Sequence, residues 1–171
     1  MVKVAGLVFL FIGSSLIGFM KSAEIKKRKD LLEDYKELIL QISTRIGYFK
    51  EPIPVIFREI ADQREGQTGQ LLKCWLLYYE ISQERIDEMW NKAVKDVYES
   101  EPLSFTDKQV LMKCGSFLGQ SDYENQKKHF DMLNHQLDTQ INDADEDIRT
   151  KGRMYSKMGV CMGALIAITL I

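Results

Sequence analysis

The chain has 171 residues, of which 45% are hydrophobic and 28% charged, and it contains only three prolines. This length suits one domain with a sizeable core, and so few prolines argue against an architecture rich in strands and turns. The net charge is −2, but 24 acidic and 13 basic residues lie between Asp30 and Ile148. Such an acidic region argues against a nucleic-acid-binding protein, whose surface would be basic.

The first predicted element is an apolar segment from Val4 to Met20, which has no charged residue over 17 positions. As a helix it would be about 26 Å long, close to the hydrocarbon core of about 30 Å in a bilayer. A cleaved signal peptide is the alternative, but only Lys3 precedes the segment, and the strongly basic flank follows it. We therefore predict an uncleaved transmembrane helix over residues 1–20, with the chain from Lys21 onward in the cytoplasm.

Residues 21–157 are predicted to form a cytoplasmic bundle of six antiparallel helices. Apolar residues recur there at spacings of three and four, which is the pattern of amphipathic helices. The six stripes lie at 32–49, 55–61, 71–79, 86–97, 110–118 and 130–148. Trp75 and Trp90 belong to the third and fourth stripes, so both are expected to be buried. A surface position in an interface is the alternative for these two side chains.

Signals between the stripes predict where these helices begin and end. Pro52 and Pro54 break the chain after the first helix and can open the second. Gly66–Gly69 is interpreted as the turn before the third helix. Thr106–Gln109 is interpreted as a capping box before the fifth helix. The sixth helix is predicted to begin near Ser121 and to continue without a break into the last segment of the chain.

That last segment, residues 158–171, is apolar and follows a second basic flank. Its 14 residues are short for a full span, so a buried helix end or a shallow insertion is the alternative to a membrane helix. Gly159–Gly163 places small residues on one face, which either allows another membrane helix to approach closely or is the ordinary glycine content of membrane helices. The predicted fold class is therefore all-α: a six-helix antiparallel bundle flanked by N- and C-terminal membrane helices.

Basic residues gather in two flanks, one beside each apolar segment. In addition to orienting the anchors, they are predicted to bind anionic lipid headgroups, each charge near the surface contributing on the order of 1 kcal/mol. The predicted membrane-surface residues are Lys21, Lys26, Lys27, Arg28, Lys29, Arg149, Lys151, Arg153 and Lys157.

The densest polar stretch of the chain is "LGQSDYENQKKHF", from Leu118 to Phe130. Gly119 can end the fifth helix in a left-handed conformation, and Ser121–Glu124 can form the capping box of the sixth. This structural interpretation leaves Gln126 unexplained, because its side chain points along the apolar stripe of the sixth helix. A polar group there must find a partner, either inside the protein or in another one.

Catalytic or metal-binding chemistry has little support in the same stretch. A Ser–His–acid triad would need Ser121 to reach His129 about two turns away along one helix, with no oxyanion hole in evidence. His135 lies on a different face from His129, so a metal site would lack ligands. We predict no catalytic residues, no metal and no cofactor. Three widely spaced cysteines without a CxxC pair favour reduced thiols over a zinc site or disulfides: Cys74, Cys114 and Cys161.

The turns at residues 47–54 and 119–122 are predicted to meet at the end of the bundle that faces the cytoplasm, because the first helix leads away from the membrane and the sixth returns to it. That end offers exposed side chains and free helix N–H groups to a partner. The alternative is that the same residues only cap and lock the bundle. The predicted partner-binding residues are Tyr48, Phe49, Lys50, Glu51, Ser121, Asp122, Gln126 and His129.

The stretch "LGQSDYENQKKH" (118–129) also resembles the L-G-x-S-D-x-x-x-Q-x-x-H signature of the stage III sporulation protein AB family of endospore-forming bacteria. Further matches fall in the order of that family: "GSSLIGF" (13–19), "GYFKEPIP" (47–54), "SFTDKQVLMKCGSFLG" (104–119) and the apolar tail. The resemblance covers essentially the whole chain. The cytoplasmic region of the family is similar to the helical-bundle domain of type II secretion F proteins.

The resemblance implies a non-enzymatic membrane scaffold of the sporulation channel, located in the mother-cell membrane facing the forespore and required for endospore formation. Its partners would be other stage III sporulation channel proteins and a secretion-type ATPase, with no nucleic acid and no small-molecule substrate. The resemblance carries over no catalytic residues. The alternative function is a small membrane-bound enzyme or metal-dependent helical protein that uses the cluster from Ser121 to His129. Turnover or metal retention by the purified protein would distinguish the two.

Overall fold

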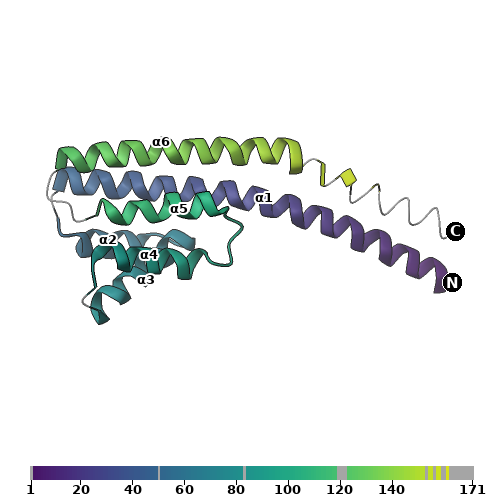
Figure 1. Cartoon of the computed structure of the whole chain (residues 1–171). Coiled ribbons are helices and arrows are strands. Elements are labelled where there is room, and N and C mark those ends of the chain that lie inside the picture. Colours follow the sequence, from purple (N-terminus) through teal and green to yellow (C-terminus); the bar gives the residue numbers. More distant parts are fainter. Residues whose placement is uncertain are drawn as a thin grey trace. The chain divides into compact units, whose positions relative to one another are not determined.

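The computed structural model describes residues 2–49, 51–82, 84–118, 123–152, 154–155, 157–158 and 161 of the chain. Over these residues it contains six α-helices and no strand, which confirms the predicted all-helical class (Figure 1). The chain forms two compact units: unit 1 comprises Met1–Lys29 with Asn142–Ile171, and unit 2 comprises Asp30–Ile141. Unit 2 holds nearly all of the buried apolar side chains in the described part of the chain.

Helix α1 (Val2–Phe49) contributes residues to both units, and its part in unit 2 buries one side. The buried side chains recur at intervals of one, three and four residues, which places them on a single helix face. They are Leu31, Leu32, Tyr35, Leu38, Ile39 and Ile42. Ile46, the next residue of the predicted stripe, is half-buried. The predicted stripe is therefore confirmed as far as Ile42.

Helices α2 (Ile53–Gln63) and α3 (Gly66–Ile81) follow as an antiparallel pair. Pro52 precedes α2 and Pro54 lies in its first turn, as predicted from the preference of proline for helix starts. The prediction of a separate turn at Gly66–Gly69 is wrong, because these residues form the first turn of α3. Gly66 has a φ of 79°, and a Cβ at Gly69 would lie 2.1 Å from the Arg64 carbonyl oxygen. The two glycines permit a tight entry into the helix rather than a longer loop.

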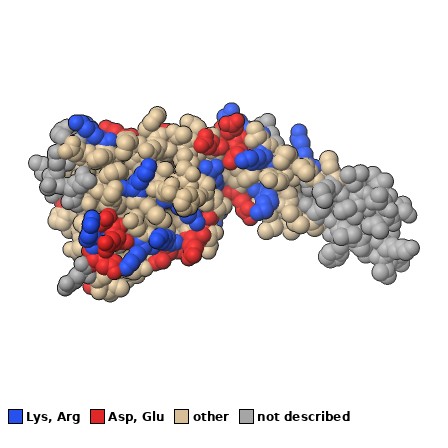
Figure 2. Space-filling model, viewed as in Figure 1, with Lys and Arg blue, Asp and Glu red and all other residues tan. Residues whose placement is uncertain are grey.

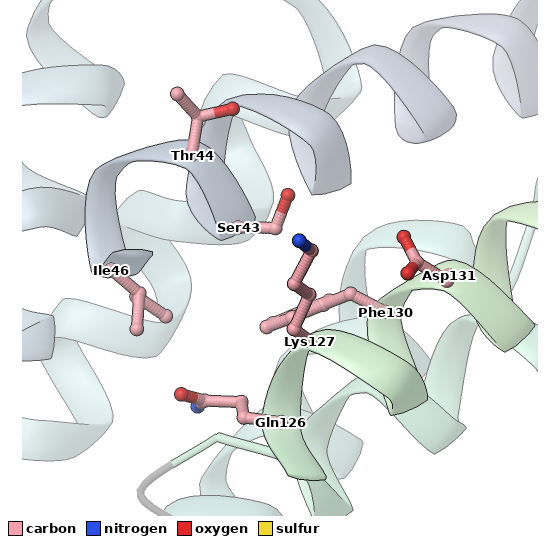
Figure 3. A pocket seen from close by; sticks show the side chains of 7 residues that line it. All are labelled: Ser43, Thr44, Ile46, Gln126, Lys127, Phe130 and Asp131. Atoms are coloured by element: carbon pink, nitrogen blue, oxygen red, sulfur yellow. The ribbon is translucent and has the colours of Figure 1, made fainter. Parts of the chain in front are cut away.

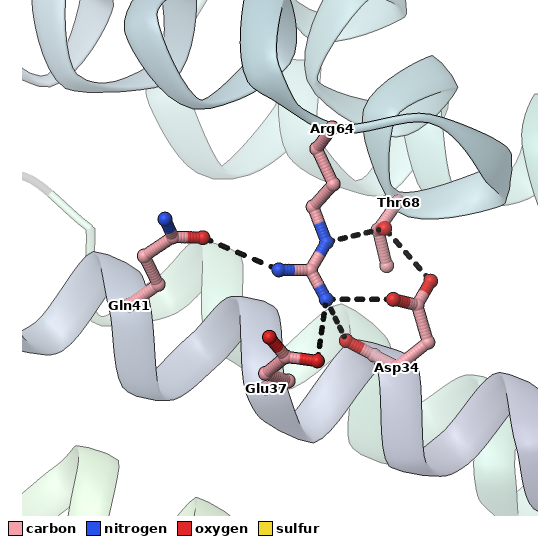
Figure 4. A network of polar contacts seen from close by, with 5 residues as sticks. All are labelled: Asp34, Glu37, Gln41, Arg64 and Thr68. Atoms are coloured by element: carbon pink, nitrogen blue, oxygen red, sulfur yellow. Dashed lines mark hydrogen bonds and ion pairs between the residues drawn. The ribbon is translucent and has the colours of Figure 1, made fainter.

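Arg64, in the short link between α2 and α3, ties this pair to α1 (Figure 4). Its guanidinium donates to the side chain of Asp34 at 2.6 Å, to Gln41 at 3.2 Å and to Thr68 at 2.9 Å. Thr68 in turn donates to Asp34 at 2.8 Å, and Glu37 lies 3.2 Å from the guanidinium. The Arg64 side chain is only 14% exposed, so its charge depends on these partners.

Helices α4 (Ile86–Tyr98) and α5 (Phe105–Lys113) complete this side of the bundle, and the 3₁₀ turn η1 (Cys114–Ser116) follows α5. The capping box of α5 lies two residues before the predicted one. Ser104 Oγ accepts from the Asp107 N–H at 3.1 Å, and the Ser104 N–H donates to the Asp107 carboxylate at 2.7 Å. A carboxylate three residues after the serine fits this motif as Glu or Gln does, so Ser104 takes the cap in place of Thr106.

A cluster of aromatic rings forms the centre of unit 2. Trp75 and Trp90 have no exposed surface, which confirms the prediction that both are buried. The ring of Phe57 lies between them, with centroid distances of 4.7 Å to Trp75 and 5.7 Å to Trp90. The Leu111 carbonyl accepts two hydrogen bonds, from the Tyr35 hydroxyl at 2.7 Å and from Trp90 Nε1 at 3.0 Å. Tyr35 and Trp90 therefore find hydrogen-bond partners for their polar atoms while their rings are buried.

Helix α6 (Tyr123–Asp147) buries Phe130, Leu133 and Leu137 in unit 2, as its predicted stripe requires. After Asp147 the chain continues as the π-helical segment η2 (Ile148–Gly152). Residues 154–155, 157–158 and 161 beyond it are again helical, so the continuation of this helix into the last segment of the chain stays a prediction. The wider turn leaves Gly152 buried, where a Cβ would lie 3.4 Å from the Ser22 hydroxyl of unit 1. π-Helical turns of this kind occur mostly as single-turn bulges inside α-helices.

The sequence predicts a membrane helix at each end of the chain. Residues 4–20 lie within α1, and of residues 158–171 the structure describes Met158 and Cys161. In the described part of the chain, no helix combines the length and the apolar content needed to cross a membrane.

Candidate functional site

A hollow of about 170 Å³ lies in unit 2 between the last turns of α1 and the first turns of α6 (Figure 3). These are the helix ends at which the sequence predicts a partner-binding site. We call this feature the tip hollow. Its lining residues are Ser43, Thr44 and Ile46 from α1 and Gln126, Lys127, Phe130 and Asp131 from α6.

The α1 wall of the tip hollow has already used its hydroxyl donors. Ser43 and Thr44 both donate to the carbonyl of Leu40, at 3.0 and 2.8 Å. A hydroxyl that donates once can still accept hydrogen bonds, so this wall offers hydrogen-bond acceptors to a binding partner. Ile46 adds a half-buried apolar side chain.

The α6 wall combines a buried ring with one charge of each sign. Phe130 is 3% exposed, whereas Lys127 and Asp131 are exposed and lie four residues apart on the same helix face. Figure 3 shows Lys127 extending toward Ser43 of α1. A space of this size is comparable to an engineered apolar cavity of about 150 Å³ that holds one benzene ring. The tip hollow therefore has room for a single apolar side chain flanked by polar groups.

Gln126 lines the tip hollow but does not project from the protein. Its side chain is 4% exposed, and its Nε2 donates to the carbonyl of Phe117 at 2.9 Å. The predicted exposure of Gln126 is therefore wrong. The sequence leaves open whether this amide finds its partner inside the protein or in another protein. The structure shows a partner inside the protein, the carbonyl of Phe117. The bond joins the first turn of α6 to the chain just after η1.

His129 also packs against Phe117. Its ring stacks on Phe117 with a centroid distance of 4.5 Å and an interplanar angle of 4°. The imidazole is half-buried, and its face is occupied by the phenyl ring. Among the described residues, no three His, Cys, Asp or Glu side chains come close enough together to hold a metal ion.

The structure describes only part of the predicted partner-binding set. Gln126 and His129 come together around Phe117, and Glu51 is half-buried just before α2. Tyr48 and Phe49 form the end of α1, with side chains outside the described part. Three further predicted residues lie outside it altogether: Lys50, Ser121 and Asp122. Their meeting at one end of the bundle stays a prediction.

Sequence reasoning missed most of the residues that line the tip hollow. Phe130 was assigned to the core, and Ser43, Thr44 and Ile46 belong to a helix whose stripe gave no sign of a gap. The spacing of Lys127 and Asp131 was the one available signal, since opposite charges four residues apart share a helix face. Where that face lies relative to α1 depends on tertiary packing.

The predicted membrane-surface residues of unit 1 meet two aspartates that the prediction did not include. Asp147 accepts from Arg28 at 3.3 Å and lies 2.7 Å from Lys151. Asp145 accepts from Lys29 at 2.8 Å and, in the same way, lies 2.8 Å from another base, Arg149. The remaining described bases of the set are exposed: Lys21, which pairs with Glu24 at 2.8 Å, and Lys26, Lys27 and Lys157. Arg153 lies outside the described residues.

The two aspartates connect the basic flanks, which are far apart in the sequence. Each carboxylate pairs with one base of α1 and with a base four residues further along its own segment. The hydrogen bond from Lys29, assisted by the charge of Arg149, holds the pKa of Asp145 below its ordinary value. The two aspartates thus partly neutralise four of the nine predicted bases.

Comparisons with known proteins agree on one family. The family model for stage III sporulation protein AB matches residues 3–171. Stage III sporulation protein AB of Bacillus subtilis (strain 168) is 21% identical to the chain over 170 residues, which cover 99% of each protein. A solved structure of a stage III sporulation protein AB matches with a TM-score of 0.65 and 20% sequence identity, covering 71% of this chain and 96% of the solved one. That structural likeness shows the same fold.

Proposed function

We propose that this chain, which belongs to the stage III sporulation protein AB family, is a non-enzymatic membrane scaffold of the channel between mother cell and forespore. The observation that carries the proposal is the extent of the family match, which runs from residue 3 to residue 171 and so includes both ends of the chain as well as the bundle. The scaffold holds partners at the mother-cell membrane facing the forespore and is required for endospore formation.

Exposed apolar side chains in unit 1 support the membrane attachment. Large apolar side chains scattered singly on a protein surface are ordinary, but a contiguous run of them is a mark of membrane or partner contact. Four of them directly precede the basic flank that begins at Lys21, and three more come from the other end of the chain. They are Leu16, Ile17, Phe19 and Met20, with Met154, Tyr155 and Met158. This order, apolar then basic, suits an anchor whose flank meets anionic headgroups.

The tip hollow supports the second half of the proposal, which is the recruitment of partners. Its two apolar side chains and its two charges suit a partner segment that inserts one apolar side chain between polar groups. The partners proposed for this site are other channel proteins, including a secretion-type ATPase. In this role Lys127 and Asp131 orient the partner, and Ile46 and Phe130 contact its apolar side chain.

The experiment compares two neighbouring lysines in a strain that lacks the gene. Lys127 lines the tip hollow, whereas Lys128 is also exposed but does not line it. We expect Lys127→Glu to lower the yield of heat-resistant spores and the co-purification of channel proteins, and Lys128→Glu to leave both near the level of the wild type. Thermal unfolding of the two variants should be alike.

Normal sporulation after disruption of the gene would refute the sporulation role as a whole. Equal effects of Lys127→Glu and Lys128→Glu would refute the tip hollow as the docking site while leaving the scaffold role standing.

A further inference from the structure

A second, larger hollow lies on unit 2 between α2 and α3, and neither the core nor the proposed docking site uses it. Its volume is about 360 Å³, and it is open to the surroundings. We call it the α2–α3 groove. Its lining residues are Arg58, Ala61 and Asp62 from α2 and Lys73, Leu76, Leu77 and Glu80 from α3.

The middle of the α2–α3 groove is apolar. Ala61 is buried at its base, Leu76 is half-buried, and Leu77 is 61% exposed. Ile81, one turn further along α3, is 77% exposed, and Val55 on α2 is 45% exposed. Leu77, Ile81 and Val55 lie outside the core of unit 2, so an apolar surface remains on this pair of helices.

The rim of the α2–α3 groove carries charges that alternate in sign. Arg58 and Glu80 face each other across it, with 3.1 Å between the guanidinium and the carboxylate. Because α2 and α3 are antiparallel and joined by a short link, Asp62 and Lys73 lie nearer that link than Arg58 and Glu80 do. The order around the rim is therefore positive, negative, positive, negative. Figure 2 shows the same mixing, with Lys and Arg among Asp and Glu where Figure 1 places α2, α3 and α4.

An alternating rim is complementary to itself. A two-fold axis in the plane of the groove and along the helices sets Arg58 of one copy against Glu80 of the other, and Asp62 against Lys73. An axis across the helices sets Arg58 against Asp62, and Lys73 against Glu80. Both arrangements bring only opposite charges together, over an apolar centre. A partner surface of one sign, such as an anionic membrane or a nucleic acid, would instead be repelled by two of the four charges.

We propose that the α2–α3 groove is a self-association surface, which pairs with the same groove of a second copy of this chain about a two-fold axis. Such isologous contacts are the commonest kind in homo-oligomers. This pairing is independent of the tip hollow and of what docks there. The Leu77 side chains of the two copies fill the centre, and the four rim charges of each copy restrict the pairing to the two axis directions that bring unlike charges together.

The two-fold axis makes the surface sensitive to single changes, because every contact occurs twice. Arg58→Glu replaces two attractive contacts by two repulsive ones, so we expect the dissociation constant of the full-length protein in non-ionic detergent to rise at least about tenfold. Leu77→Asp should weaken association further. Lys92→Glu is the control, since it changes the same charge at another exposed ion pair, with Glu84, outside the groove. Sedimentation velocity measures all four proteins. A wild-type protein that stays monomeric at every concentration overturns the proposal.

Inverting all four rim charges gives the sharper test. The variant Arg58→Glu, Asp62→Lys, Lys73→Glu, Glu80→Arg keeps the alternation, so its copies should pair with each other as the wild type does. Mixed pairs would bring like charges together. Differently tagged copies expressed together should therefore co-purify as wild type with wild type and as inverted with inverted, but not as wild type with inverted. Equal recovery of the mixed pair overturns the proposal, because a purely structural role of these residues gives no such selectivity.

The direction of the axis follows from exchanging one pair alone. In the double variant Arg58→Glu, Glu80→Arg, an axis along the helices still opposes unlike charges, and association is kept. An axis across the helices opposes like charges at every corner, and association is lost. Either result assigns the axis, provided that the fourfold inversion has already given the selective pairing.

Discussion

The interactions within unit 1 differ in kind from those within unit 2. In unit 2, Trp75 and Trp90 have no exposed surface, and the ring of Phe57 lies within 5.7 Å of both. In the described part of unit 1, the contacts are ion pairs such as Arg28 with Asp147, and a large apolar side chain such as Ile17 is 65% exposed. One unit buries its apolar residues, and the other presents them.

Because of this difference, the two units are expected to respond differently to added salt. Burying a large apolar side chain contributes roughly 1.5–3 kcal/mol to the free energy of unfolding, and salt does not screen this contribution. Truncating such a side chain costs more than this when a cavity is left behind. An exposed ion pair contributes about 0.2–1 kcal/mol and is screened by salt. Unit 2 is therefore expected to unfold at a denaturant concentration that depends little on ionic strength, whereas the contacts of unit 1 weaken as salt is added.

The largest effect is expected from the centre of unit 2. Trp90→Ala should lower the free energy of unfolding by about 3–5 kcal/mol, because it opens a cavity beside Phe57 and removes a hydrogen bond to Leu111. Urea unfolding of the full-length protein, followed by circular dichroism, measures it. Phe105→Ala is the control: this ring is 78% exposed, so its loss should cost less than about 0.5 kcal/mol. Equal costs for the two changes would place Trp90 on the surface.

Arg64→Ala is expected to come next. The change leaves the Asp34 carboxylate and the Thr68 hydroxyl without their shared donor, which should cost about 2–4 kcal/mol. Arg64→Lys should recover only part of this, because an ammonium cannot reproduce the fork of a guanidinium. The same unfolding measurement applies, with Arg85→Ala as an exposed control at 77% side-chain exposure. If Arg64→Lys recovered the full stability, the charge of residue 64 would matter and the geometry of the guanidinium would not.

Gln126→Glu tests the buried amide at the tip hollow. The carboxylate cannot donate to the Phe117 carbonyl and is itself desolvated, so we expect a loss of about 1–3 kcal/mol. Gln109→Glu, at an exposed position, should be close to neutral. If Gln126→Glu left stability unchanged and still abolished sporulation, the side chain would act in binding rather than in packing.

The ion pair between Arg28 and Asp147 should show the opposite behaviour to Trp90. A double-mutant cycle with Arg28→Ala and Asp147→Ala is expected to give a coupling free energy of about 0.5–1 kcal/mol at low salt. The coupling should be smaller at about 1 M salt without vanishing, because the two side chains are only 14% and 28% exposed. The cost of Trp90→Ala should be the same in both solutions. A coupling that does not change with salt would contradict the expectation that ion pairs in unit 1 weaken as salt is added.

The smallest effect is expected from acidification. The hydrogen bond from Lys29 lowers the pKa of Asp145 below its ordinary 3.8 in the folded protein. The stabilisation from Asp145 is therefore fully present above 3.8 and is lost as the pH falls through the lower, folded value. Unfolding curves across the acid range should show this loss in the wild type and not in Asp145→Asn. A loss that begins well above 3.8 would point to another group.

The helices themselves could be predicted because apolar spacing reflects burial directly. Leu32, Tyr35 and Leu38 repeat with the helical period and are all buried. Errors arose where two local signals compete. Ser104 and Thr106 both precede an apolar stripe, and only the bond to Asp107 decides between them. Glycine likewise signals both turns and tight helix starts, which is why Gly66–Gly69 was assigned to a turn.

The candidate site could be predicted less well, because its geometry is tertiary. Sequence reasoning recognised that Gln126 needs a partner, since a polar side chain on an apolar stripe cannot stay unsatisfied. It could not name Phe117, whose carbonyl becomes available only where η1 ends. The pairing of Asp145 with Lys29 was missed for the same reason: 116 residues separate the two, and no local pattern connects them.

The placement of the aromatic cluster also decides how each unit can be observed. Both tryptophans of the chain lie in unit 2, so tryptophan fluorescence, excited selectively, reports on that unit and not on unit 1. Cys161 supplies the complement: it is the exposed thiol in unit 1, whereas Cys114 is buried and burial raises the pKa of Cys74. A maleimide dye at Cys161, read beside the tryptophan emission, would give each unit its own optical signal in a single protein.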